Sequence, residues 1–184
     1  MGVAFIVEGK MEKLIIESLC RGSRVQTINN GSDVSMEVMA KQIASHVRLI
    51  SKCHHPIVIV FDRERRPESA INIKCSLVEM LTREGVDCDA LRIVVADRTI
   101  ENWILAGTDE IEVSKQYGAK GMEGRSILGL LRKELSSIGI EYHKTTSGVM
   151  LFRKINRKRA AAESQSFRDL CEATADYCFW TRNS

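Results

Sequence analysis

The sequence lacks the features of a disordered or membrane-spanning protein. It has only two prolines and 5% aromatic residues, yet 44% of its 184 residues are hydrophobic, as in folded globular proteins. No apolar run approaches the roughly 20 residues that cross a bilayer, and Glu8 stands where a signal peptide would need apolar residues. We therefore expect a soluble cytoplasmic protein with no membrane contact, built as one domain with a small appended subdomain.

Motifs for structural zinc and for a nucleotide-binding P-loop are also missing. The six cysteines are widely spaced without a C-x-x-C pair, and several lie in apolar surroundings, which predicts reduced thiols in a reducing compartment. The cluster Cys53-His54-His55 has no fourth zinc ligand nearby. Gly9-Lys10 lacks the preceding glycine and four-residue spacer of a P-loop.

Basic residues are concentrated in one part of the chain. The net charge is +3, but residues 144–159 contain six basic side chains and no acidic one, so the rest of the chain has a net negative charge. Lys144, Arg153 and Arg157 in this stretch could follow a nucleic-acid backbone. Docking of an acidic partner protein and an ordinary solvated helix face are the alternatives.

Apolar runs alternate with helical patterns over the first 106 residues. This alternation predicts an α/β fold with a mainly parallel sheet and helices on both faces, over a core of residues 1–107. A dense turn is predicted at 29–33. Residues 108–184, which include a glycine-containing stretch at 118–124, are predicted to form a small helical subdomain. The predicted strands are 3–7, 24–28, 57–61 and 91–96, and the predicted helices are 11–22, 34–50, 67–85, 99–106, 126–137, 149–155 and 166–175.

Acidic residues follow three of the predicted strands. Glu8, Asp62 and Asp97 each follow the last apolar residue of a strand, so in a parallel sheet they should converge on one edge. Glu64 would point to the same side as Asp62 if the chain stays extended, and Glu101 lies one helical turn from Asp97. Neighbouring carboxylates repel each other unless a cation binds, and such oxygen ligands suit Mg²⁺ or Mn²⁺.

These acids have more than one interpretation. Two acidic pairs and Glu8 are enough for two cations, which stabilise the attacking and leaving oxygens of a phosphodiester displacement. Alternatively, Arg63, Arg65 and Arg66 could pair with Glu64 on a solvated loop. A phosphoacceptor receiver domain is a third interpretation, although receivers need paired acids after the first strand.

Two segments carry a resemblance to a known family. Residues 5–10 (FIVEGK) and 59–64 (IVFDRE) resemble the two motifs of the Toprim domain of topoisomerases, bacterial primases and several nucleases. Glu64 stands where aspartate is usual, and the glycine often found shortly after that pair is missing. Residues 96–106, with the later Ser164, Ser166 and Phe167, resemble small stand-alone Toprim-like proteins encoded beside ABC-type ATPases in bacterial defence loci. Those proteins are similar to the nuclease half of the overcoming-lysogenization-defect family.

The resemblance implies a Mg²⁺- or Mn²⁺-dependent nuclease acting on DNA or RNA. It assigns Glu8 as catalytic acid/base or metal ligand, Asp62 and Glu64 as metal ligands, and Asp97 and Glu101 as acids of a second metal site. An alternative is a subunit without autonomous activity that docks on an ABC-type ATPase through residues 144–182. Lys10 and nearby arginines would neutralise phosphate, and the residues expected to contact nucleic acid are Arg63, Arg65, Arg66, Arg98, Lys144, Arg153 and Arg157.

Overall fold

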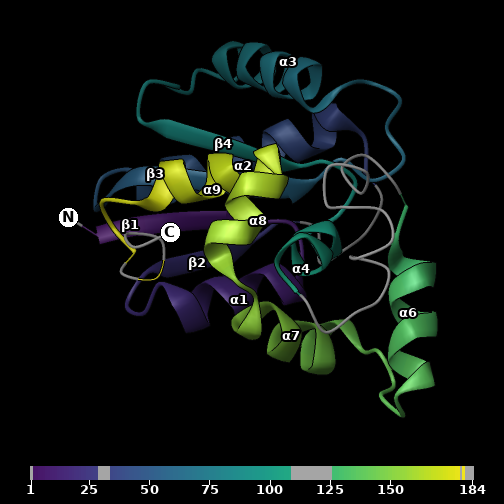
Figure 1. Ribbon diagram of the computed structural model, residues 1–184. Coiled ribbons are helices and arrows are strands. Elements are labelled where there is room, and N and C mark those ends of the chain that lie inside the picture. The colour runs from purple at the N-terminus through teal and green to yellow at the C-terminus, as the bar shows by residue number, and fades with distance from the viewer. Residues whose placement is uncertain (1, 29–33, 109–125, 179, 181–184) are drawn as a thin grey trace.

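The centre of the molecule is a four-stranded sheet in which every strand pair is parallel, in the order β2-β1-β3-β4 (Figure 1). The computed structural model describes residues 2–28, 34–108, 126–178 and 180. The α/β prediction is therefore confirmed. The strands are β1 (Gly2–Val7), β2 (Arg24–Thr27), β3 (His54–Asp62) and β4 (Leu91–Ala96).

Helices connect the strands and continue to the C-terminal part of the chain. They are α1 (Lys10–Leu19), α2 (Met36–Ile50), α3 (Ala70–Arg83), α4 (Glu101–Gly107), α6 (Leu128–Ser137), α7 (Val149–Lys154), α8 (Arg157–Glu163) and α9 (Gln165–Thr174), with a short π-helix η2 (Lys144–Gly148) before α7. The sequence did not predict α8, because its charged residues and alanines show no apolar periodicity.

Serine side chains fix where two of the helices begin. Ser35 accepts a hydrogen bond from the backbone N–H of Val38 at the start of α2, and Ser69 does the same for Asn72 at the start of α3. Helix α3 therefore starts after Pro67 and not at it. The predicted turn at 29–33 and the glycine-containing stretch 118–124 lie outside the described residues.

The sheet separates two apolar clusters, because successive side chains of a strand point to opposite faces. Ala4 and Ile6 pack with α2 and α3, whereas Phe5 and Val7 pack with α1, α4 and the C-terminal helices. Asp62 follows Val58 and Val60 at intervals of two, so its side chain faces α1 and α4. This face of the sheet carries the candidate site.

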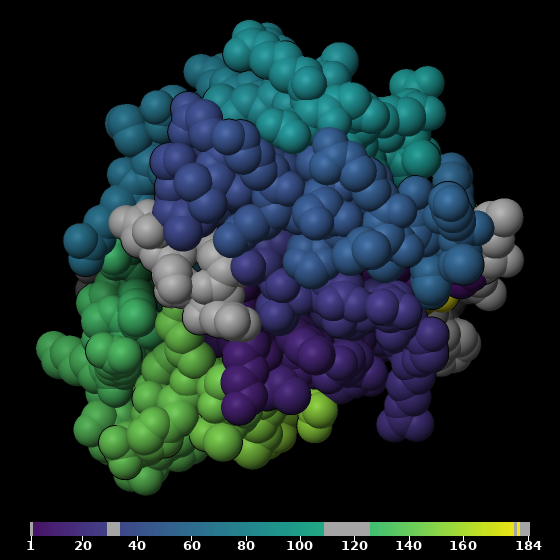
Figure 2. Space-filling model, turned by 180° about the vertical axis from the view of Figure 1, so that it is seen from behind, coloured from purple at the N-terminus to yellow at the C-terminus, as the bar shows by residue number. Residues whose placement is uncertain are grey.

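The C-terminal helices pack directly on the first half of the chain. Helix α7 contacts α1, α8 contacts α4, and α9 contacts β4; Figure 2 shows the green C-terminal helices against the purple N-terminal segment. Trp103 of α4 packs on Phe152 and Phe167, with ring centroids 6.2 and 5.7 Å away. One apolar cluster thus spans both halves, and the domain division at residue 107 stays a prediction.

A disulfide joins Cys20, at the end of α1, to Cys178 after α9. This corrects the prediction of reduced thiols for these two cysteines, which lie 158 residues apart in sequence and meet only because the C-terminal helices fold back. Cys53, Cys75, Cys88 and Cys171 remain in the thiol form. Within the described residues, no helix is long and apolar enough to cross a membrane.

Candidate functional site

The site begins where β1 and β3 end side by side. Val7 pairs with Val60 in the register, which places Glu8 next to the last residues of β3. Glu8 Oε2 accepts a hydrogen bond from the backbone N–H of Asp62 at 3.2 Å, and both carboxyl groups are buried. The sequence prediction that these two acids meet at the carboxyl edge of the sheet agrees with this geometry.

Two further acids join them from the helices that cover this face. Glu12 lies in the first turn of α1, and Glu101 is the first residue of α4; both are buried, and Glu101 is 0% exposed. The backbone N–H of Ile100 donates to Asp62 Oδ1 at 3.0 Å, which fixes the start of α4 against the end of β3. We call Glu8, Glu12, Asp62 and Glu101 the acid cluster.

Glu101 is bonded by two residues that arrive from the C-terminal half. The Tyr142 hydroxyl donates to Glu101 Oε1 at 3.1 Å, and Lys144 Nζ lies 3.4 Å from the same oxygen. In the part of the chain that the structure describes, Glu101 Oε2 has no hydrogen-bond partner. An unpaired buried carboxylate oxygen is costly, so a water molecule or an ion is expected beside it.

Burial and mutual repulsion raise the pKa of two members of the acid cluster, Asp62 and Glu12. Burial, followed by the charges of Glu12, Glu101 and Glu8, raises the pKa of Asp62 well above its ordinary value. Burial likewise raises the pKa of Glu12, and Glu8 and Glu101 add to the effect. Burial lowers the pKa of Lys144, but attraction to Glu101, Asp62 and Glu12 raises it more, so this lysine stays charged. Lys144 thus offsets part of the negative charge of Glu101, Asp62 and Glu12.

A pocket of about 350 Å³ opens beside the acid cluster. We call it the acid pocket; Glu8, Lys10, Glu12, Asp62, Glu64 and Lys144 are among its lining residues. Glu64 lines the acid pocket, but the predicted extended chain beyond β3 is not present. The residue lies in a turn with φ of 52°, in the left-handed region.

Asp97 lies outside the acid cluster. Its carboxylate pairs with Arg63, with Nε to Oδ1 at 2.5 Å, and its backbone N–H donates to Ser166 Oγ at 3.4 Å. Ser166 Oγ also accepts from Trp103 Nε1 at 2.8 Å. The structure therefore separates Asp97 from Glu101, which the sequence had placed in one acidic pair.

The predicted nucleic-acid contacts divide into two groups. Arg63 and Arg66 bond to the backbone of the loop after β3 and of the segment before α2: Arg63 donates to the carbonyls of Arg66 and Glu68, and Arg66 donates to those of Asp62 and Val34. These two guanidinium groups thus hold the loop together.

The other predicted contacts lie nearer the surface. Arg65 and Lys144 are exposed beside the acid pocket, and Arg98 is half-buried there. Arg153 is exposed on α7. Arg157 donates to the Trp180 carbonyl and lies 5.4 Å from the centre of the Trp180 ring, so it anchors the C-terminal segment.

A divalent cation fits this donor set. Across the described residues, no three carboxylate, imidazole or thiol groups form a complete ligand set for a metal ion. Mg²⁺, however, is usually held by one or two carboxylates, with water and substrate phosphate supplying the remaining oxygens. Glu8 and Asp62 line the acid pocket, and Glu101 has an unpaired oxygen, so these carboxylates suit such a cation.

The site contains functional candidates that the sequence analysis missed. Glu12 shares the buried helical face of Ile15, Ile16 and Leu19, and an acid on an apolar face is a signal that could have found it. Tyr142 gave no such signal, since it lies in a loop. Protein-family models, curated proteins and solved structures gave no match to the chain.

Proposed function

We propose that the protein is a metal-dependent nuclease that hydrolyses phosphodiester bonds of DNA or RNA with Mg²⁺ or Mn²⁺. The acid cluster carries this proposal: four buried carboxyl groups lie together at the carboxyl edge of a parallel sheet, Lys144 pairs with Glu101, and Glu101 keeps an unpaired oxygen. The cost of burying these groups is removed when a cation binds. An adjoining pocket with exposed basic residues suits a phosphate-containing substrate.

The residues of the acid pocket suggest distinct roles in hydrolysis. Glu8 and Asp62 would hold the cation, with Glu64 at the pocket wall. When bound, the cation would stabilise negative charge on the phosphate oxygens. Lys10 lines the pocket at the first residue of α1, where its ammonium and the helix end both favour an anion.

Glu12 is the candidate proton acceptor. Its raised pKa brings the carboxylate nearer to the range in which a general base works best. It lies on α1, one helical turn after Glu8, and lines the acid pocket. In this proposal Glu12 takes the proton of the attacking water, while Lys10 and Lys144 neutralise the phosphate.

Cleavage by matched acid-to-amide variants tests the proposal. Asp62→Asn and Glu12→Gln should lose metal-dependent cleavage of single-stranded DNA, plasmid and tRNA, and chelator should abolish wild-type cleavage. Glu17→Gln is the control, because Glu17 lies on the exposed face of α1 and pairs only at the surface with Lys13. The proposal fails if both pocket variants cleave as fast as Glu17→Gln while remaining folded.

The resemblance adds a partner and a setting to the proposal. We infer a cytoplasmic effector of a bacterial defence system that acts with an ABC-type ATPase, which would dock on residues 144–182. Arg153, Lys154 and Lys158 are exposed in this region and give it a basic surface. Cleavage that appears only after the ATPase is added would support this arrangement, and co-elution in size-exclusion chromatography would detect the complex.

A further inference from the structure

A second pocket, of about 430 Å³, adjoins the acid pocket. The two pockets share Glu64 and Lys144 as lining residues, so they are neighbours across this pair. Three cationic side chains line the second pocket: Arg65, Arg98 and Lys144. We call it the cationic pocket. It sets a positively charged site directly beside a negatively charged one.

The wall between the pockets is held in a strained conformation. Glu64 and Arg98 have φ of 52° and 84°, and they are the non-glycine residues with positive φ in the described ranges. Such a conformation is costly for a residue other than glycine. Reciprocal bonds stabilise the pair: Glu64 N–H donates to the Arg98 carbonyl, and Arg98 Nη1 donates to the Glu64 carbonyl, both at 2.7 Å. The Arg98 guanidinium is thereby fixed at the pocket, and backbone strain of this kind is concentrated at functional sites.

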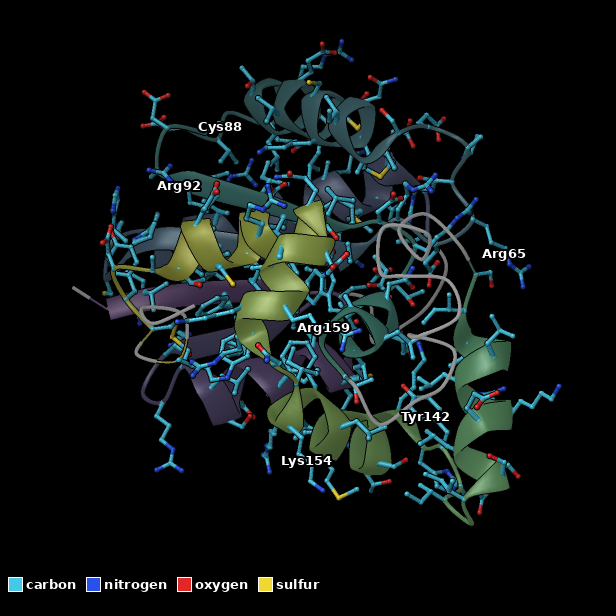
Figure 3. All side chains as sticks on the ribbon, in the orientation of Figure 1. Arg65, Cys88, Arg92, Tyr142, Lys154 and Arg159 are labelled. Carbon is cyan, nitrogen blue, oxygen red and sulfur yellow. A yellow bond between two sulfur atoms is a disulfide. The ribbon has the colours of Figure 1, made fainter. Side chains whose placement is uncertain are left out.

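Two of the cations that line the pocket, Arg65 and Arg98, are permanent, because arginine remains protonated at every relevant pH. Ser126, Ile127 and Leu128, which lead into α6, also line the pocket. Figure 3 shows Arg65 on the same side of the molecule as the beginning of α6. An anion in the pocket would therefore meet positive charge from several directions.

We propose that the cationic pocket binds a phosphate of a single nucleic-acid strand whose neighbouring phosphodiester lies in the acid pocket. This inference rests on the proposed function and names its substrate class. Pockets of about 430 and 350 Å³ are at the small end of the range for small ligands. Each is about the size of one nucleotide, so two adjacent nucleotides of a single strand would fill both pockets. Phosphate contacts carry no sequence information, so binding should be sequence-independent.

Binding without catalysis tests this inference separately from the nuclease activity. Fluorescence anisotropy would measure the affinity of labelled oligo-dT, oligo-U and a duplex of equal length in chelator. Arg65→Ala removes an exposed side chain that has no described role in folding. Loss of one single-strand phosphate contact lowers the salt slope by about 0.7, which corresponds to about fivefold weaker binding at 0.1 M salt.

Charge-matched controls separate a pocket effect from a general loss of charge. Lys52→Ala also removes one exposed cation, but Lys52 precedes β3 at the opposite end of the sheet, so binding should be unchanged. Arg65→Lys keeps the charge and should restore most of the affinity. The inference is overturned if Arg65→Ala and Lys52→Ala bind alike, or if the duplex binds as tightly as the single strands.

The two proposals can fail independently. Arg65-dependent binding of single strands, without cleavage in Mg²⁺ or Mn²⁺ either alone or with the ATPase, would support the cationic pocket and overturn the nuclease. Metal-dependent cleavage with binding that ignores Arg65 would support the nuclease and overturn the cationic pocket.

Discussion

Replacing Asp62 with asparagine tests whether repulsion among the carboxyl groups of the acid cluster destabilises the folded protein. The side-chain oxygen of the asparagine would still accept the hydrogen bond from Ile100 N–H, while the variant removes one of four buried carboxyl groups. We expect Asp62→Asn to be more stable than the wild type in chelator at pH 7. We also expect it to lose most of the stabilisation that Mg²⁺ gives the wild type.

The ordinary pKa of aspartate bounds the size of this gain. At pH 7 an aspartate with an unfolded-state pKa of 3.8 costs at most about 4 kcal/mol to protonate, at about 1.36 kcal/mol per pH unit. Asparagine is neutral without this cost. Since Lys144 already offsets part of the repulsion, we expect the free energy of unfolding to rise by about 1–3 kcal/mol. A chain of this length gains roughly 2–4 °C in Tm for each kcal/mol.

Thermal unfolding followed by circular dichroism, in chelator and in millimolar Mg²⁺, measures both effects. Asp97→Asn is the matched control, because it removes the carboxylate that pairs with the buried guanidinium of Arg63 and should destabilise the protein. The reasoning is refuted if Asp62→Asn unfolds at a lower temperature than the wild type in chelator.

The pH dependence of folding stability tests the same reasoning independently. The folded-state pKa values of Asp62 and Glu12 are raised above their unfolded values of 3.8 and 4.5. The folded protein therefore binds more protons than the unfolded chain in the interval above these values. The contribution of both groups to stability falls as pH rises through that interval. In chelator, the advantage of Asp62→Asn should grow with pH from about 4 upward, and a constant difference would contradict the assignment.

Three further predictions follow from contacts elsewhere in the fold. Gly107→Ala should lower the free energy of unfolding by about 1–3 kcal/mol in urea titrations, because a Cβ there would lie 2.6 Å from Ile155 Cβ. The control Gly129→Ala should not destabilise the protein, because its Cβ would meet nothing within 4 Å. Reduction should lower the free energy of unfolding of the wild type by about 3–5 kcal/mol, since the disulfide closes a loop with a sequence separation of 158. Reduction should leave the stability of a Cys178→Ser variant unchanged, and equal sensitivity of both proteins would argue against the disulfide. Tyr142→Phe should cost about 1–3 kcal/mol in chelator by removing a buried donor to a carboxylate, and an unchanged Tm would show that this bond contributes nothing.

The sequence by itself determined the α/β class and the approximate position of each strand. Runs such as Ile57–Phe61 are continuous and β-branched, so they form buried parallel strands without help from distant residues. In a parallel sheet the carboxyl ends share one edge, and for this reason the meeting of Glu8 and Asp62 could be predicted. Both conclusions depend on local pattern and a general rule of topology.

Only the tertiary structure decided which other residues complete the site. Glu101 enters the acid cluster because α4 packs against the end of β3, whereas Asp97, four residues earlier, is held away by Arg63. Tyr142, in a loop, and Lys144, at the start of η2, come some 40 residues later in the chain, where no periodicity predicts that they contact Glu101. Contacts between segments so distant in sequence depend on how helices pack on the sheet, and local spacing does not encode that packing.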